Sequence, residues 1–334
     1  MTQPTPETIW NLNEKDFLDL LESDLFKQKD KEIRFYAPSF RYYKTKHYSS
    51  LPNSFPTISV TGKSCSLKCK HCGGKVLETM HPAPSPQELF DVCNKLKQSG
   101  AQGCLVSGGC QPDGSVPLDG FVGVLGKIKR ELGLTVFVHT GIISFDTAVS
   151  LKHAGVDAAL IDVIGSAETI IKIYNLKVTP KDYANSLEAL EEAELPFVPH
   201  VIVGLNEGKL DGELEALKMI NRVEPSAVVI IAFMPIHATV MAKTLPPKPL
   251  DIAKVTAAAR LMFPQTPLIL GCMRPKGQTR AATDVLAIKA GVNAIAFPSE
   301  ETIKYVQKEH LKFSFSSFCC AQMYLDANQS KKLQ

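Results

Sequence analysis

The sequence has few of the features that mark membrane, nucleic-acid-binding or disulfide-stapled proteins. No apolar run approaches the roughly 20 residues that a membrane-spanning helix needs. The formal net charge is only +3 in 334 residues, which is too small to indicate a nucleic-acid or membrane-surface partner. The nine cysteines are an odd number, and no secretory signal pattern precedes them, so a disulfide framework is not expected. We therefore expect a soluble, cytoplasmic protein with reduced cysteines.

One short stretch, "TGKSCSLKCKHCGGK", holds three cysteines but lacks a fourth. Cys65, Cys69 and Cys72 have the spacing C-x3-C-x2-C. A structural zinc site needs four ligands, and no second C-x2-C or H-x3-H pair follows. His71 is a possible fourth zinc ligand, although it is crowded between its neighbours. Iron–sulfur clusters are held by cysteine thiolates, normally four. Three thiolates therefore predict a cluster with one iron left open for a cofactor or substrate.

The first part of the chain, residues 1–53, differs in pattern from the rest. Phe17, Leu20, Leu21 and Phe26 fall on one face of a predicted helix. An aromatic and basic stretch follows at 35–43. We interpret this part as an N-terminal extension that packs on the main domain, in preference to a surface that stacks nucleic-acid bases.

From residue 54 onward, short apolar strands alternate with capped amphipathic helices. The continuous apolar character of the strands is typical of parallel strands that are buried on both faces. Eight β/α units favour a closed (β/α)8 TIM-type barrel over 54–300 rather than an open doubly wound sheet. The remaining 301–334 segment is expected to fold over the barrel mouth. The predicted strands lie at 56–61, 103–108, 134–140, 158–164, 197–203, 227–233, 267–272 and 294–297.

Polar and sulfur-bearing residues follow nearly every predicted strand. The active site of such a barrel lies at the carboxyl ends of its strands, so these residues are the candidate site. They are Ser107, Gly108, Gly109 and Cys110 after the second strand, His139, Asp162 and His200 on the next three, Met234 after the sixth, and Cys272 and Arg274 after the seventh.

The cysteine spacing, in a loop after the first strand, resembles the signature of the radical S-adenosylmethionine (radical SAM) superfamily. The resemblance implies a [4Fe–4S] cluster on Cys65, Cys69 and Cys72, S-adenosylmethionine on its open iron, and an electron donor such as ferredoxin. The "SGG" stretch at 107–109 resembles the Gly-Gly-Glu element that receives the methionine amino group. Cys110 stands at the position of the Glu in that element. "HVIVGLNE" resembles the G-x-I-x-G-x-x-E element that supports adenine. The residues expected to bind the cofactor are Ser107, Gly108, Gly109, His139, Asp162, His200, Ile202, Gly204, Glu207 and Met234.

The stretch from 271 to 297 is similar to the corresponding part of biotin synthase. There an Arg on strand 7 faces the sulfur-donating cluster, and Arg274 is the matching residue. Cys110, Cys272, Cys319 and Cys320 are accordingly candidate ligands of a second iron–sulfur cluster. The alternative is that all four pack in the protein interior. Adjacent residues of an extended strand point in opposite directions, so only one of Cys319 and Cys320 need be a ligand.

Together these motifs resemble the archaeal-type lipoyl synthases, which work as a pair of radical SAM proteins. This resemblance implies sulfur insertion into an octanoyl chain on a lysine of an acceptor protein, with a second radical SAM partner. If Cys110 and Cys272 lay in separate regions, this interpretation would lose its sulfur donor. The alternatives are a biotin-synthase-like lyase, isomerase or methylase that acts on a small molecule, and an iron–sulfur or zinc scaffold without turnover.

Overall fold

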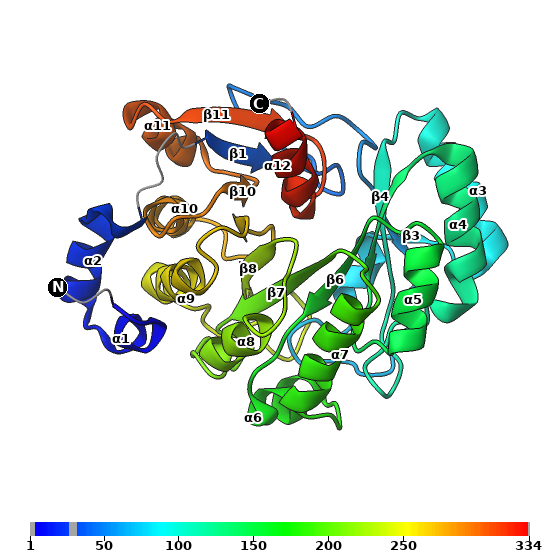
Figure 1. Ribbon diagram of the computed structural model, residues 1–334, viewed down its shortest axis with the longest axis horizontal. Coiled ribbons are helices and arrows are strands. Elements are labelled where there is room, and N and C mark those ends of the chain that lie inside the picture. The colour runs from blue at the N-terminus through cyan, green and yellow to red at the C-terminus, as the bar shows by residue number, and fades with distance from the viewer. Residues whose placement is uncertain (1–3, 27–31, 333–334) are drawn as a thin grey trace.

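The computed structural model describes residues 4–26 and 32–332 and contains one eleven-stranded sheet, in which every strand pair is parallel. The strand order is β11-β1-β10-β9-β8-β7-β6-β5-β4-β2-β3, and the sheet curls around a concave face (Figure 1). The strands are β1 Glu32–Tyr36, β2 Thr57–Ser59, β3 His81–Pro82, β4 Gly103–Ser107, β5 Thr135–His139, β6 Ala158–Asp162, β7 Phe197–Val203, β8 Val228–Ala232, β9 Leu268–Leu270, β10 Ala294–Ala296 and β11 Lys312–Ser316.

Each of the eight strands expected from the sequence is present inside its predicted range, as β2 and β4 to β10. They follow one another in the sheet in chain order, as repeated β/α units require. The prediction of a parallel α/β sheet is therefore confirmed.

The predicted (β/α)8 barrel is confirmed only in part, because strand pairing does not close the sheet among the described residues. β3 and β11 are its two edges, because β1 and β11 occupy the side of β10 that would pair with β2 in a closed barrel. Loops join the two ends instead. Ser54 Oγ donates to the Ser317 carbonyl at 2.9 Å, and the rings of Phe55 and Phe318 meet edge-on at 6.1 Å. Both terminal parts of the chain thus contribute strands to the sheet.

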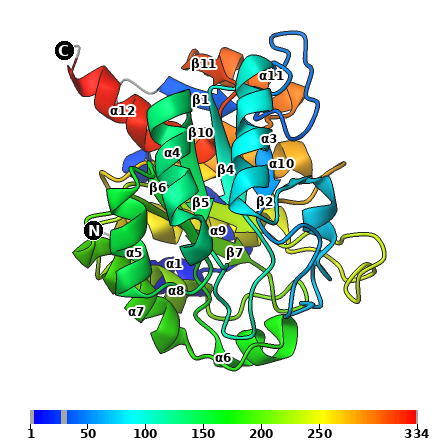
Figure 2. The same cartoon turned by 90° about the vertical axis from the view of Figure 1, so that its right-hand side faces the viewer.

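Helices cover the convex face, with α3, α4 and α5 over β4 and β5 (Figure 2). The expected caps are present: Ser85 Oγ accepts from Glu88 N, and Thr179 and Asp182 form a capping box. The helices and helical turns are α1 Pro6–Asn11, α2 Glu14–Glu22, η1 Asp24–Phe26, η2 Lys75–Thr79, α3 Pro86–Gln98, η3 Asp119–Phe121, α4 Val122–Leu132, α5 Phe145–His153, α6 Ala167–Thr169, η4 Ile170–Tyr174, α7 Pro180–Glu192, α8 Glu213–Ile220, α9 Pro249–Met262, α10 Arg280–Lys289, α11 Glu300–Lys308, η5 Cys320–Gln322 and α12 Met323–Lys332.

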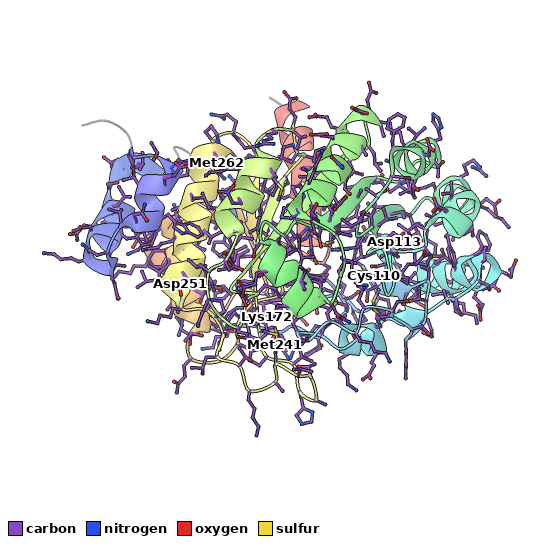
Figure 3. The ribbon with its side chains drawn as sticks, turned by 90° about the horizontal axis from the view of Figure 1, so that it is seen from below. Cys110, Asp113, Lys172, Met241, Asp251 and Met262 are labelled. Atoms are coloured by element: carbon purple, nitrogen blue, oxygen red, sulfur yellow. The ribbon has the colours of Figure 1, made fainter. Side chains whose placement is uncertain are left out.

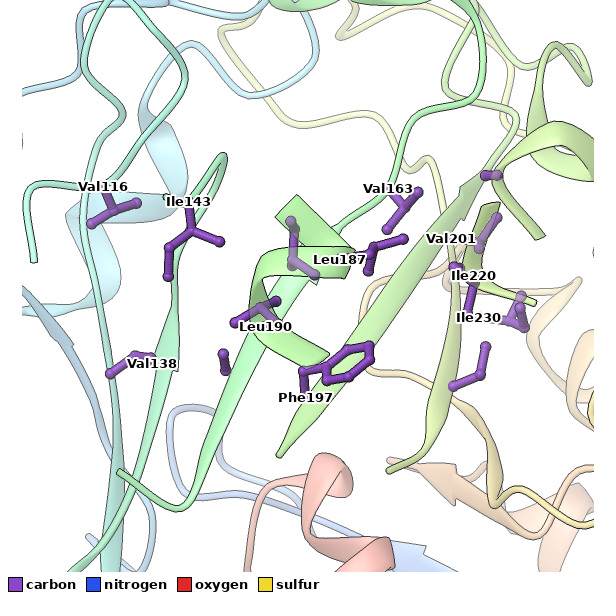
Figure 4. Packing of buried hydrophobic residues seen from close by; sticks show 14 of the residues in the cluster. Val116, Val138, Ile143, Val163, Leu187, Leu190, Phe197, Val201, Ile220 and Ile230 are labelled. Atoms are coloured by element: carbon purple, nitrogen blue, oxygen red, sulfur yellow. The ribbon is translucent and has the colours of Figure 1, made fainter. Parts of the chain in front are cut away.

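The largest hydrophobic cluster fills the layer between the sheet and these helices, for example where Leu187 and Leu190 of α7 pack over Phe197 and Val201 of β7 (Figure 4). The predicted N-terminal helix is α2, and its apolar face packs with Ala253 and Ala257 of α9. None of the described helices is long and apolar enough to cross a membrane.

Within the C-terminal segment, α11 is followed by β11, which extends the sheet, whereas the next part, η5 and the start of α12, lies inside the curl of the sheet instead of over its carboxyl edge. Cys320, Met323 and Tyr324 pack with the inward side chains of the strands. Tyr324 Oη donates to the carbonyl of Asp157, directly before β6. The segment was expected over the barrel mouth, but its apolar side chains fill the concave face down to the amino end of β6. Burial of apolar surface is the physical reason for this position.

Candidate functional site

The loop after β2 brings part of the cysteine triplet into a compact group. The ligand atoms of Cys69, His71 and Cys72 lie within 4.8 Å of one another. Cys69 Sγ donates to the Tyr174 carbonyl at 3.6 Å. Cys65 lies close enough for its charge to raise the pKa of Cys69, although a hydrogen bond with Cys72 is the larger cause.

The loop keeps this shape through left-handed backbone positions and tight turns. Lys68 has φ +49°, and Gly73 and Gly74 have φ +52° and +77°. Glycine adopts this region without steric cost, whereas Lys68 does so at some expense. The Cys69 carbonyl accepts from the amides of Cys72 and Gly73 at 3.2 and 2.7 Å. The turn therefore folds Cys72 back toward Cys69.

The "SGG" element packs directly against this loop. A Cβ atom built on Gly109 would lie 2.0 Å from the Ser64 carbonyl oxygen and 2.6 Å from Cys65 Cα, so only glycine fits. Gly109 N donates to Thr61 Oγ1 at 2.7 Å, and Thr61 Oγ1 donates to the Ser64 carbonyl at 2.9 Å. Thr61 was not among the predicted site residues, because its role depends on a contact between two strand ends.

The thiols of the first cysteine group differ in acidity. The hydrogen bond between Cys69 and Cys72 raises the pKa of Cys69 and lowers the pKa of Cys72 to about 4, with a further contribution from His71 to the latter. His71 Nδ1 is buried and has no hydrogen-bond partner in the described part of the chain. Three thiols beside a close glycine backbone fit a cluster held by three cysteines. Because this nitrogen has no partner, His71 remains a candidate ligand if the site binds zinc instead of an iron–sulfur cluster.

A row of three polar side chains lies on adjacent strands β5, β6 and β7. Asp162 and His200 are register partners, and His139 Nε2 lies 3.4 Å from Asp162 Oδ1. Burial acts to raise the pKa of Asp162, but His139 and His200 lower it overall. Burial lowers the pKa of His200 to about 4 against the pull of Asp162. At neutral pH the row therefore presents an ionised carboxylate beside an uncharged imidazole, a pair that can accept hydrogen bonds from hydroxyl groups.

The other predicted cofactor residues are less closely grouped. Ser107 Oγ donates to the His139 carbonyl at 3.4 Å, and Gly108 packs against Thr61. Ile202 and Met234 are half-buried.

Two residues of the "HVIVGLNE" element at the end of β7 contact other protein groups and not a cofactor site. Gly204 packs on Pro247, and its amide donates to the buried Glu213 at 2.8 Å. Glu207 is exposed and forms an ion pair with Lys172 at 2.8 Å. Glu213 was not among the predicted site residues.

The second cysteine group joins the loop after β9 to the segment after β11. Cys272 follows β9, whereas Cys319 and Cys320 precede α12. Burial raises the pKa of Cys272 to about 11, and the neighbouring Cys319 adds to this effect. Cys319 and Cys320 interact with each other, because the 3-10 turn that begins at Cys320 bends the backbone between them. Both thiols therefore stay together, contrary to the expectation for an extended strand.

Arg274 lies beside this second group and is completely buried. Its Nε donates to Asp284 Oδ1 at 2.9 Å, and its Nη1 donates to the Gly271 carbonyl. Arg280 Nε lies 3.5 Å from the same Asp284 oxygen. Arg274 Nη2 and Arg280 Nε have no hydrogen-bond partner among the described residues. Two guanidinium groups thus share one carboxylate, which leaves an excess positive charge and free donors next to three thiols.

Cys110 belongs to the first group rather than the second. Burial raises its pKa to about 12, and the neighbouring charges that contribute are those of Cys65, Asp162, Cys72 and Asp113. Figure 3 shows Cys110 close to Asp113. The structure therefore does not unite Cys110 with Cys272. Within the described residues, only the first group brings three ligand atoms within 4.8 Å.

Comparisons with known proteins agree with this arrangement. Residues 59–219 match the Radical SAM superfamily model. A biotin synthase from Neorickettsia sennetsu is 26% identical over 249 residues, which cover 72% of this chain and 74% of that protein. A biotin synthase from Prochlorococcus marinus is 26% identical over 299 residues, which cover 86% of this chain and 81% of that protein.

Solved structures share the fold. Methylornithine synthase (PylB) superposes with a TM-score of 0.61 at 16% identity and covers 93% of this chain and 94% of its own. HydG, a maturase of the [FeFe]-hydrogenase, gives a TM-score of 0.61 at 16% identity, with 94% and 68% covered.

The superfamily implies a [4Fe–4S] cluster with S-adenosylmethionine, and the group at Cys69 and Cys72 lies within the matched range. The curled parallel sheet, the cysteine loop at the carboxyl end of β2 and the biotin synthase matches agree with one another: residues 59–219 match the Radical SAM superfamily model, and the chain is similar to the biotin synthases.

Proposed function

We propose that the protein inserts sulfur into an unactivated C–H bond of an aliphatic chain, and that a second iron–sulfur cluster at Cys272, Cys319 and Cys320 supplies the sulfur. The observation that carries this proposal is the excess positive charge of Arg274 and Arg280 beside these three thiols. Buried thiolates repel one another, and a cation or metal compensates their charge.

The residues of the first group would hold the other cluster. Cys65, Cys69 and Cys72 are its proposed ligands, and the backbone around Gly109 would receive the amino group of S-adenosylmethionine. When bound, the cluster supplies one electron to S-adenosylmethionine, which yields the radical that removes a hydrogen atom from the substrate. Asp162 and His200 would accept hydrogen bonds from the ribose hydroxyls.

Arg274 has a positioning role in this proposal. Its planar fork offers donors in fixed directions, and Asp284 and Gly271 hold two of its nitrogens. The third nitrogen is free to donate to a cluster sulfide or to a substrate carbonyl. The inward side chains of the sheet would exclude water from the reacting carbon.

The proposed substrate is an octanoyl chain on a lysine of an acceptor protein, with a second radical SAM protein as partner. This part rests on the sequence resemblance to archaeal-type lipoyl synthases alone. The separation of Cys110 from Cys272 takes away the donor site on which the lipoyl synthase interpretation was based. The substrate proposal therefore depends on Cys272, Cys319 and Cys320 acting as the donor site without Cys110.

Anaerobic reconstitution with iron and sulfide tests the proposal. We expect two clusters per chain, reductive formation of 5′-deoxyadenosine, and a sulfur-containing octanoylated acceptor domain in the mass spectrum. Formation of 5′-deoxyadenosine without thiolated product would favour a lyase, isomerase or methylase. Bound zinc and no dependence on S-adenosylmethionine would favour the non-catalytic scaffold with His71 as the fourth ligand.

A further inference from the structure

Four loops at the carboxyl edge of the sheet form one continuous outer surface over the first cysteine group. Lys70, between Cys69 and His71, donates its amide to the Ile173 carbonyl at 2.8 Å, and its carbonyl accepts from Met241 N at 3.3 Å. A Cβ atom on Gly208 would lie 2.1 Å from the Leu245 carbonyl oxygen. The cysteine loop, the η4 turn and the loops after β7 and β8 are thus in contact, and Figure 3 shows Lys172 next to Met241.

This surface combines large exposed apolar side chains with lysines. Ile171 is 65% exposed, Val240 79% and Leu245 81%. Such side chains in one contiguous patch mark an interaction site more often than an ordinary surface. We call the surface the lysine face and define it by Ile171, Val240 and Leu245 together with Lys68, Lys70, Lys172, Lys209 and Lys243.

The lysine face carries a positive net charge, because its lysines outnumber the acids near them. Lys70, Lys172 and Lys209 all act on Glu207 and help to lower its pKa, the ion pair with Lys172 being the largest cause. Glu168 and Asp211 are two further acids that act on Lys172. Five lysines against these three acids would attract an acidic partner and steer its approach.

We propose that the lysine face docks an acidic one-electron carrier protein. The proposal rests on the proposed function, because that function requires one electron for each cleavage of S-adenosylmethionine. The reduced carrier would lose one electron, and the cluster on the loop beneath Lys70 would gain it. A protein that delivers substrate needs access to the concave face, where His139, Asp162 and His200 lie, and the lysine face includes none of these residues.

Binding of an acidic [4Fe–4S] ferredoxin to the reconstituted protein tests the proposal. In Lys209→Glu/Lys243→Glu, which leaves the cysteine loop intact, we expect the dissociation constant at low salt to rise roughly tenfold or more. Val240→Asp should weaken binding as well. Lys95→Glu/Lys97→Glu changes the charge equally on the exposed side of α3 and should bind like the wild type.

Activity with two reductants separates this proposal from the proposed function. The face variants should form 5′-deoxyadenosine normally with dithionite and slowly with reduced ferredoxin. Absence of S-adenosylmethionine cleavage with dithionite in the wild type would overturn the proposed function. The ferredoxin-binding measurement would still test the docking proposal in that case. Equal ferredoxin affinity in face and control variants, failure of the wild type to bind, or selective loss of acceptor-protein binding would overturn the docking proposal.

Discussion

The two cysteine groups of this protein are built in opposite ways. Cys65, Cys69 and Cys72 come from one loop, and left-handed turns and the close backbone of Gly109 fix their positions. Cys272, Cys319 and Cys320 approach one another only because the C-terminal segment enters the concave face behind β9 and β10.

The difference extends to how each group handles charge. In the first group, Cys69 and Cys72 share a hydrogen bond next to His71, and no arginine is among the causes that shift their pKa values. In the second group, the guanidinium groups of Arg274 and Arg280 act on the thiols. Backbone turns thus maintain the geometry of the first group, which comes from one loop. The second group comes from distant segments and depends on a buried ion pair. Damage to the two groups should therefore have separable consequences.

The largest expected effect comes from Cys69→Ala. We expect loss of the first cluster and of 5′-deoxyadenosine formation to background, because the remaining thiols cannot hold a cluster with one open iron. Iron analysis and chromatography of the products measure both. Cys93→Ala, which also removes a buried thiol, is the control and should keep cleavage. Near-normal cleavage in Cys69→Ala would contradict the assignment.

Simultaneous replacement of Cys272, Cys319 and Cys320 by alanine should eliminate thiolated product and remove roughly half of the bound iron. Formation of 5′-deoxyadenosine should persist, because the first group is untouched. Cys110→Ala should leave the iron of the second site in place, since Cys110 lies beside Cys65. Thiolated product in the triple variant would refute the sulfur donor.

The substitution Arg274→Lys keeps the positive charge but loses the planar arrangement of guanidinium donors. Product formation should fall about tenfold or more with little change in S-adenosylmethionine cleavage, and loss of the guanidinium hydrogen bonds to Asp284 and Gly271 should cost on the order of 2 kcal/mol of stability. Arg260→Lys is a matched control, because Arg260 is also buried but donates to backbone carbonyls and Asn293. A loss of stability with unchanged product formation would assign Arg274 a purely structural role.

Gly109→Ala should displace the cysteine loop, because its Cβ atom would overlap the Ser64 carbonyl oxygen. We expect a stability loss of about 1–3 kcal/mol and weaker retention of the first cluster during gel filtration. Gly123→Ala places the same methyl group where nothing lies within 4 Å and should retain iron normally. Equal iron in both variants would show that the loop adapts.

The smallest expected effect concerns the pH dependence of stability. The pKa of His200 is about 4 in the folded protein and near 6.5 in the unfolded chain. Between these values the unfolded chain binds more protons, so stability falls as the pH falls from 6.5 to 4. His200→Gln should remove on the order of 2 kcal/mol of this fall, measured by urea unfolding of the apoprotein at several pH values. An unchanged pH slope would show that His200 titrates normally.

Much of the fold was predictable, because buried parallel strands leave continuous apolar runs and helix caps leave local signatures. The eight strands follow directly from these runs. The strands β1 and β11, which extend the sheet beyond β10, were not predicted, since nothing in the sequences of Glu32–Tyr36 and Lys312–Ser316 indicates which strand each would pair with. Whether the sheet closes depends on which strand pairs with the free edge of β10, β1 or β2. That choice depends on contacts between segments far apart in the sequence.

For the site, the same division holds. The sequence by itself determined the cysteine triplet, the glycines that shape it and the strand-end positions of His139 and Asp162, because spacing along a loop or strand fixes these relations. Only the tertiary structure decided that Cys110 lies with Cys65, and that Arg274 shares Asp284 with Arg280. These partners come from different elements, and burial of the C-terminal segment inside the curled sheet determines which thiols meet which charges.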